Sequence, residues 1–160
     1  MTIHIGIDPG ATGAIAVFEV ELGVLTIYDM PVMEVLRGGK AKKEINPYIL
    51  AEILGMWKSR SNITVTMEKV GAMPGQGVSS MFQFGRGVGM LEGVLAGIGN
   101  TVNYVTPQKW QKEVAMRPGK DGGRERAMQL FPGNASDFFR KKDDGRADAA
   151  LIAYWSFIKS

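Results

Sequence analysis

The segment IGIDPGATGAIAV, residues 5–17, ends a strand-like run on an aspartate and continues at once into a glycine-rich turn. A carboxylate at the end of a buried strand is costly unless a backbone cap, a basic side chain or a metal ion pairs with it. The alternation over residues 3–8 places Asp8 on the same strand face as His4 and Gly6. Asp8 is therefore either a turn residue that caps its own backbone or an acid that meets a partner from elsewhere.

The order of predicted elements indicates an α/β fold in one domain, residues 1–160. Residues 3–8, 14–20 and 24–30 predict three strands joined by short turns, an antiparallel β-meander. Residues 31–45 carry no strong pattern and predict a basic loop. Asn46 and Pro47 suit a helix start. The remaining elements are expected as helix 47–61, strand 62–70, helix 80–98, strand 102–106, helix 107–110, helix 124–131 and helix 146–158.

The composition restricts the chemistry that the chain can perform. It has no cysteine and one histidine, which excludes disulfide scaffolds and cysteine-ligated zinc and argues against histidine-rich metal sites. Hard oxygen ligands remain available. The first residues already alternate like a strand, and the longest apolar run, about residues 87–99, is interrupted by Glu92. We therefore expect a cytoplasmic protein.

Positive charge is concentrated in two parts of the chain. The span 109–146 has ten basic and six acidic side chains, and the expected loop contains Arg37, Lys40, Lys42 and Lys43. Such surfaces favour a polyanion. An ordinary solvated basic face is the alternative.

A second acid shares the strand face of Asp8. In NITVTMEKV, residues 62–70, the alternation places Glu68 on the same face as Thr64 and Thr66. If this strand pairs with the first and both bury their apolar faces in one core, Asp8 and Glu68 emerge together. Two converging carboxylates repel unless a cation lies between them, and oxygen ligands suit Mg²⁺ or Mn²⁺. The alternative for Glu68 is an exposed charge at a strand end.

The segment KKDDGRADAALIA, residues 141–153, supplies further acids. Asp148 lies in an otherwise apolar helix turn, Asp144 shares its face four residues earlier, and Asp143 lies just outside. A helix packed across the sheet would bring Asp148 to Asp8 and Glu68. Such a set of acids can surround two cations about 3.5–4 Å apart, the spacing used in phosphodiester hydrolysis. One of Asp143 and Asp144 could instead be a helix N-cap.

The expected helix 80–98 has glycines four residues apart. Gly85, Gly89, Gly93 and Gly97 leave one helix face bare. Each costs about 1 kcal/mol in a helix, so the stripe predicts the close approach of a second helix. That helix comes either from a partner subunit or from this chain.

Taken together, the residues resemble the RuvC family of Holliday junction resolvases, in its bacteriophage branch. The resemblance rests on IGIDPG, MEKV, the spacing from Glu68 to Arg86-Gly87, VTPQKWQKEV and DDGRADAALIA, which occur in family order along most of the chain. It implies an RNase H-like mixed five-stranded sheet flanked by helices. It also implies a homodimer, here through helix 80–98, and Mg²⁺-dependent endonuclease action on four-way DNA junctions by paired nicks.

Carried over by position, Asp8, Glu68 and Asp148 match the metal-binding acids of the family, which would hold two Mg²⁺ ions with Mn²⁺ as a substitute. The family's fourth acidic or histidine position is Gly145 here, so Asp144 or Asp143 must take that role. The phenylalanine wedge of cellular relatives is matched by Gly71.

The remaining candidates would contact DNA. Met73, Phe82 or Phe84 could replace the missing wedge by stacking. Lys112, Lys120 and Arg124 fall near DNA-contacting basic positions of the family, and Arg86 belongs to the same expected surface.

Three other functions fit parts of the sequence. A nuclease of the same fold could act on RNA–DNA hybrids or other branched DNA, and a silent protein could bind junctions without cutting them. The turn DPGATG also resembles the phosphate-binding turn of actin-like and sugar-kinase ATPases, but 160 residues cannot supply their two lobes.

Overall fold

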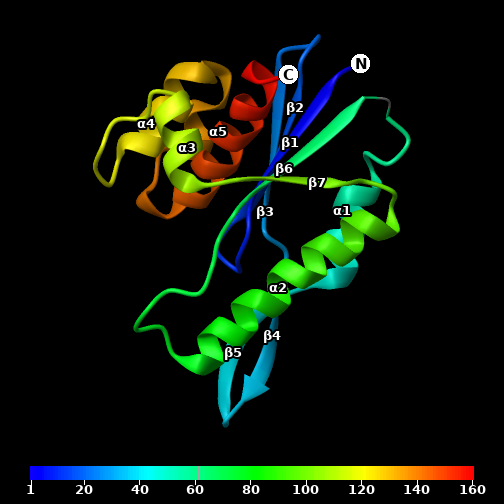
Figure 1. The fold of residues 1–160 in the computed structure, drawn as a ribbon, viewed down its shortest axis with the longest axis vertical. Helices are drawn as coiled ribbons and strands as arrows, with labels where there is room; N and C mark the ends of the chain where they lie inside the picture. Colours follow the sequence, from blue (N-terminus) through cyan, green and yellow to red (C-terminus); the bar gives the residue numbers. More distant parts are fainter. Residues whose placement is uncertain (61) are drawn as a thin grey trace.

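A computed structural model describes residues 1–60 and 62–160, in which helices lie on both sides of a central mixed sheet (Figure 1). The sheet has five strands in the order β3-β2-β1-β6-β7. Their bounds are Ile3–Asp8 for β1, Ala14–Glu19 for β2, Val24–Asp29 for β3, Ile63–Glu68 for β6 and Val102–Val105 for β7. The first three strands form an antiparallel meander, and β6 and β7 run parallel to β1. The predicted meander and five-stranded mixed sheet are confirmed.

The helices form two groups on opposite sides of the sheet (Figure 1). One group is α1 (Pro47–Gly55) and α2 (Val78–Gly97). The other is α3 (Pro107–Glu113), α4 (Gly122–Leu130) and α5 (Asp144–Ile158), with the 3₁₀ segments η1 (Pro132–Phe138) and η2 (Lys141–Asp143). Alternate side chains of β1 and β2 separate two cores: Ile5 and Ile7 pack with α1 and α2, whereas Ala16 and Phe18 pack with α5.

Helix α5 lies directly on β1. A Cβ atom built on Gly6 would lie 2.2 Å from the Ala149 carbonyl oxygen and 2.4 Å from the Ala153 amide nitrogen. Both are backbone atoms, so only glycine permits this approach. Ala149 and Ala153 are fully buried, and their small side chains keep the helix close to the strand. This contact fixes α5 over the end of β1.

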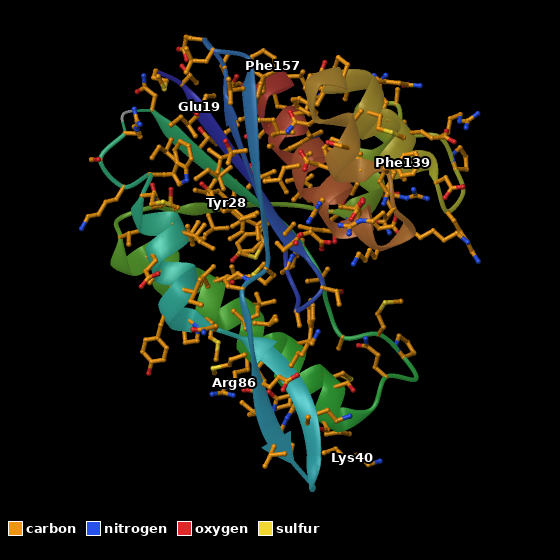
Figure 2. All side chains as sticks on the ribbon, turned by 180° about the vertical axis from the view of Figure 1, so that it is seen from behind. Glu19, Tyr28, Lys40, Arg86, Phe139 and Phe157 are labelled. Carbon is orange, nitrogen blue, oxygen red and sulfur yellow. The ribbon has the colours of Figure 1, made fainter. Side chains whose placement is uncertain are left out.

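The expected loop over residues 31–45 is wrong. These residues form an antiparallel hairpin of β4 (Val32–Arg37) and β5 (Lys40–Ile45), a two-stranded sheet of its own. Gly38 and Gly39, with φ of 58° and 72°, supply the positive φ angles that a two-residue hairpin turn needs. The hairpin runs beside the N-terminal half of α2, and Figure 2 shows Lys40 at its tip and Arg86 close to its strands.

The helices lie in the expected parts of the chain, but several begin or end at different residues. Asn46 caps α1 as predicted, since its side-chain oxygen accepts from the amides of Tyr48 at 3.1 Å and Ile49 at 3.3 Å. The helix ends at Gly55, before the expected end near residue 61, and Ser61 itself lies outside the described residues. Helices α4 and α5 each begin two residues earlier than expected. None of the helices in the described residues is long and apolar enough to span a bilayer.

The glycine stripe of α2 is not covered by any part of the chain that the structure describes. At Gly85, Gly89, Gly93 and Gly97, an added Cβ would have no described atom within 4 Å apart from adjacent residues and the nearby backbone of α2 itself. Packing of a helix from the same chain against this stripe, one of the two alternatives, is therefore wrong for these residues. The face is open.

Candidate active site

The register of β1 and β6 brings two acids side by side. Ile7 of β1 pairs with Met67 of β6 in parallel, so Asp8 and Glu68 are the final residues of neighbouring strands. Both lie on the strand face that packs against α5, because Ile7 and Met67 belong to the opposite core. The predicted parity of the two strands is confirmed by this register.

Helix α5 brings Asp148 to the same place. Burial raises the pKa of Asp8 to about 8, and the negative charges of Asp148 and Glu68 add to that shift. Burial also raises the pKa of Asp148 to about 7, with contributions from Glu68 and Asp144. The charge of Glu68 thus disfavours the ionised forms of both Asp8 and Asp148, and the charge of Asp148 disfavours that of Asp8. Among the described residues no backbone amide donates to the Asp8 carboxylate, which argues against the alternative that Asp8 caps its own turn.

The donor chemistry of this cluster fits a hard divalent cation. Asp8, Glu68 and Asp148 offer carboxylate oxygens, and a cation between them would offset the burial and repulsion that raise their pKa values. Within residues 1–60 and 62–160, however, no three acidic or histidine side chains stand close enough to form a finished metal site. The acids approach one another, but in the described residues their carboxylates are not close enough together to form a metal site.

The two neighbouring aspartates have different surroundings. Asp144 is exposed and contributes to the raised pKa of Asp148, so it lies beside the cluster. The side chain of Asp143 is 1% exposed and accepts from the Arg140 backbone amide at 2.8 Å and the Arg140 guanidinium at 2.9 Å. These bonds hold the pKa of Asp143 below its usual value despite burial. The carboxylate of Asp143 is therefore bound by Arg140 at the start of η2, whereas the carboxylate of Asp144 lies beside Asp148.

Gly145 is glycine for a packing reason. A Cβ atom there would lie 2.5 Å from the Thr12 carbonyl oxygen and 3.3 Å from Asp8 Oδ2. The start of α5 is pressed against the turn after β1, which leaves no room for a side chain. An acid or histidine at this position would require the turn to move.

Sequence reasoning assigned no role to Trp110, which anchors Glu68. Its indole Nε1 donates to Glu68 Oε1 at 2.9 Å, and the side chain is fully buried in α3. Burial raises the pKa of Glu68, while this hydrogen bond lowers it. An isolated tryptophan in the polar helix PQKWQKE was the available signal, because a buried indole needs a hydrogen-bond partner.

The DNA-contact candidates differ in how exposed their side chains are. Met73 and Phe82 are 64% and 67% exposed, on the loop before α2 and on α2. Gly71 lies on the same exposed loop, and Lys112 and Lys120 are exposed. Phe84 is partly buried beside the Gly10 turn.

Two of the basic candidates are engaged by acids. Arg86 donates to Glu44 at 3.0 Å. Arg124 is 8% exposed, and its guanidinium bonds Asp144 Oδ1 at 3.0 Å and also contacts Asp121. Arg124 thus holds Asp144 beside the acid cluster from within the protein.

Comparison with known proteins places the fold. No protein-family model matches the chain. Two solved structures cover 99% of it: T. thermophilus RuvC in complex with Holliday junction substrate, with a TM-score of 0.63 and 14% identity over 96% of that chain, and Thermus thermophilus RuvC, with a TM-score of 0.58 and 15% identity over 97% of that chain. The chain therefore has the RuvC fold, and the predicted RNase H-like class is confirmed.

One curated relative is similar in sequence. The Holliday junction resolvase MOC1, chloroplastic, of Chlamydomonas reinhardtii is 35% identical over 86 residues. These residues are 52% of this chain and about a tenth of that much longer protein. The resemblance to junction resolvases is thus confirmed in fold and in a shared segment of sequence, and the bacteriophage branch stays a prediction.

Proposed function

We propose that this protein is a Mg²⁺-dependent endonuclease that resolves four-way DNA junctions by paired symmetric nicks. The observation that carries this proposal is the convergence of Asp8, Glu68 and Asp148 at one end of a RuvC-like sheet. The shared segment with a named Holliday junction resolvase supports the substrate. An oxygen-only acid cluster is the donor set of phosphodiester-cleaving metal sites.

In this proposal Asp8, Glu68, Asp148 and Asp144 hold two Mg²⁺ ions, with Mn²⁺ as a substitute. When bound, such ions supply an activated water and stabilise the leaving oxygen of the scissile phosphate. Trp110 keeps one Glu68 oxygen in place, which leaves the other free to bind. Arg124 does the same for Asp144. Asp143 serves the fold through Arg140.

The DNA would be held around the acids by exposed side chains. Met73 and Phe82 offer apolar surface for stacking on unpaired bases at the junction centre. Lys112 and Lys120 offer positive charge to phosphates without reading sequence. Arg124, because it is buried against Asp144, acts by positioning that acid rather than by touching DNA.

A second copy of the chain would cover the glycine stripe of α2. Four glycines on one uncovered helix face allow two α2 helices to approach closely. A two-fold dimer would present two acid clusters, which matches paired nicks in a nearly two-fold symmetric junction. The proposal therefore includes a homodimer through α2.

The test is strand cleavage of a labelled synthetic four-way junction with Mg²⁺, beside a linear duplex, a Y-fork and an RNA–DNA hybrid. Wild type should nick the junction at paired symmetric positions, and Asp148→Asn should not. Glu52→Gln, an exposed acid on α1, is the matched control and should cleave like wild type. Preferential cutting of the hybrid would replace the substrate, and binding without cutting would make the protein a silent binder.

Metal binding is measured separately from cleavage. Mn²⁺ titration followed by electron paramagnetic resonance should count two ions per chain in wild type and fewer in Asp148→Asn. Two further variants identify the fourth metal-binding acid. Asp144→Asn should lose Mn²⁺ affinity in the same titration. Asp143→Asn should instead lower Tm, measured by thermal melting, because it weakens the contacts with Arg140. Equal Mn²⁺ affinity in wild type and Asp148→Asn would contradict the assigned cluster.

A further inference from the structure

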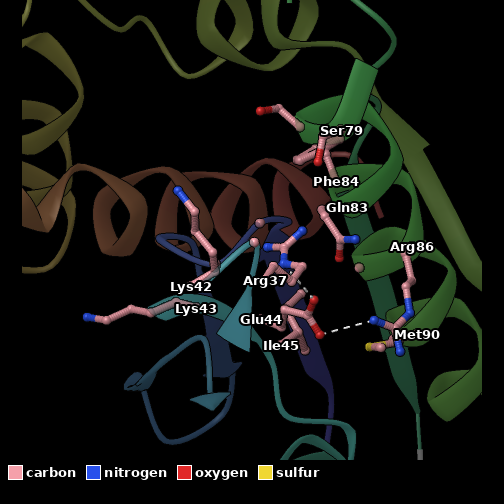
Figure 3. A pocket seen from close by; sticks show the side chains of 15 residues that line it. Arg37, Lys42, Lys43, Glu44, Ile45, Ser79, Gln83, Phe84, Arg86 and Met90 are labelled. Carbon is pink, nitrogen blue, oxygen red and sulfur yellow. Dashed lines mark hydrogen bonds and ion pairs between the residues drawn. The ribbon is translucent and has the colours of Figure 1, made fainter. Parts of the chain in front are cut away.

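A cavity of about 650 Å³ lies between the β4–β5 hairpin and α2 (Figure 3). We call it the hairpin groove. Its polar lining comes from Arg37, Lys42 and Lys43 of the hairpin and from Ser79, Gln83 and Arg86 of α2. Gly10 and Ala11 also line it, and they belong to the turn that follows Asp8. Part of the groove lining therefore lies two and three residues after Asp8 in the chain, at the same end of β1.

The groove carries excess positive charge. Four basic side chains line it against one acid, Glu44. The Glu44 side chain is 10% exposed and lies 3.0 Å from Arg86 and 3.4 Å from Arg37, so it fixes both guanidinium groups in the wall. Figure 3 shows Lys42 and Lys43 extending from the hairpin away from Glu44. Their charges are available to a ligand.

The start of α2 adds to this potential. Helix α2 is 20 residues long, and its N-cap, Gly77, provides no side-chain hydrogen bond to the first-turn amides. Ser79 and Ser80 of that first turn line the groove. Free amides, hydroxyl groups and the positive end of a helix dipole all favour an anion. Together with the four basic side chains they describe a site for several phosphates rather than for one carboxylate.

We propose that the hairpin groove binds the sugar–phosphate backbone of the DNA strand that enters the acid cluster. This rests on the proposed nuclease function and deepens it. A polyanion must be held close to carboxylates that repel it, and the groove supplies cations together with the turn that follows Asp8. The contacts are to phosphate, so they orient the strand without selecting its sequence.

The first experiment uses the absence of cysteine from the chain. Lys43→Cys, alkylated with an azidophenacyl photocrosslinker, is mixed with end-labelled junction in Ca²⁺ to hold the complex uncut. Crosslinks should fall on the strand within about one helical turn of the Mg²⁺ cut site. Lys58→Cys is the control, because it follows α1 and precedes Ile63, which pairs with Ile3 at the far end of β1 from Asp8. Equal DNA crosslinking from position 58, or crosslinks from position 43 to a second protein chain, would overturn the proposal.

The second experiment measures junction affinity against salt concentration by fluorescence anisotropy. Lys42→Gln/Lys43→Gln should bind about tenfold more weakly, and the slope of log K against log salt should decrease by up to about 1.8, since each phosphate contact contributes about 0.9. Lys58→Gln/Arg60→Gln removes the same charge from exposed positions and should match wild type. All four sites are exposed, so Tm should stay constant.

Different results would contradict the nuclease function and the DNA-binding role of the hairpin groove. If wild type neither binds nor cuts the junction, the nuclease function is wrong. If wild type cuts it and the Lys42/Lys43 double variant matches the Lys58/Arg60 control in affinity and slope, the groove proposal alone is wrong.

Discussion

On one face of the sheet, α5 lies so close to β1 that no Cβ fits at Gly6; on the other side of the molecule, the glycine stripe of α2 meets nothing in the chain that the structure describes. The first face holds the half-buried acids, with Trp110 bonded to Glu68 and buried alanines of α5 beside them. The second offers open glycines, exposed Phe82 and a basic hairpin. Glycine serves tight packing within the chain in one place and an uncovered surface in the other. The acid cluster is therefore built by the fold itself, whereas the α2 side is left for other molecules.

The largest effect is expected where the packing is tightest. Gly6→Ala places a Cβ 2.2 Å from a backbone oxygen of α5, so the helix must move off the strand. We expect a loss of at least about 3 kcal/mol in the free energy of unfolding, which thermal melting records as a fall in Tm of about 10 °C.

Gly55→Ala is the control for this prediction, since no described atom lies within 4 Å of an added Cβ there. It should leave Tm unchanged or slightly raised because alanine favours the helix. Equal stability of Gly6→Ala and wild type would mean that α5 does not rest on β1.

Strand parity is the part of this site that could be predicted from sequence. The alternation around Asp8 and Glu68, and the isolated aspartate of an apolar helix, each follow from local periods of two and 3.6 residues. The hairpin could not be predicted in this way, because β5 reads KAKKEI and has no apolar alternation. It is recognisable only once its two glycines adopt positive φ and α2 lies beside it.

Contacts between distant side chains were also beyond local patterns. Trp110 meets Glu68 across 42 positions, and Arg124 meets Asp144 across 20. Arg124 was expected on the DNA surface because it falls near the basic, DNA-contacting positions of the family that the sequence resembles. Its burial depends on how α4 packs against α5, which charge composition does not encode.

The buried acids predict a pH dependence of the metal-free protein. Their folded-state pKa values, about 8 for Asp8 and about 7 for Asp148, exceed the unfolded values near 4. The folded state binds these protons more tightly, so this contribution to stability is complete below about pH 4, decreases as the pH rises, and is lost once the pH exceeds about 7 for Asp148 and about 8 for Asp8. In EDTA, Tm should fall by about 5 °C or more between pH 6 and 8.5.

Two comparisons test the cause of that fall. Asp8→Asn should flatten the profile, and Mg²⁺ should raise the wild-type Tm at pH 8.5 because it binds the folded state. Glu52→Gln, exposed on α1, should leave the profile as it is in wild type. A wild-type Tm in EDTA that does not fall between pH 6 and 8.5 would contradict the raised pKa values of Asp8 and Asp148, which come first from burial and then from repulsion by neighbouring acids.

Trp110→Phe tests whether Trp110 positions Glu68 or only packs in the core. It retains an aromatic ring but removes the 2.9 Å hydrogen bond to Glu68. Loss of such a partner behind a metal ligand costs about 10–100-fold in activity or metal affinity. Single-turnover cleavage of the junction should slow by that factor, with junction affinity unchanged.

Trp57→Phe is the matched control. Trp57 is buried in the other core, and its indole nitrogen has no hydrogen-bond partner in the described residues. It should lose comparable packing and retain the wild-type cleavage rate. If both substitutions slow cleavage equally, Trp110 contributes only to the stability of the fold and does not position Glu68.

The smallest effect is expected at the glycine stripe of α2. There one substitution should stabilise the folded chain but weaken the dimer. Gly89→Ala adds a Cβ to a helix face with nothing within 4 Å, so helix propensity should stabilise the single chain by up to about 1 kcal/mol. If two α2 helices meet through the glycine stripe, the same Cβ separates them, and the dimer dissociation constant should rise about tenfold, equivalent to 1.4 kcal/mol. Sedimentation over a concentration series measures this, with Gly55→Ala as the helix control. A monomeric wild type, or an unchanged dimer in Gly89→Ala, would assign the open face to a partner other than a second copy.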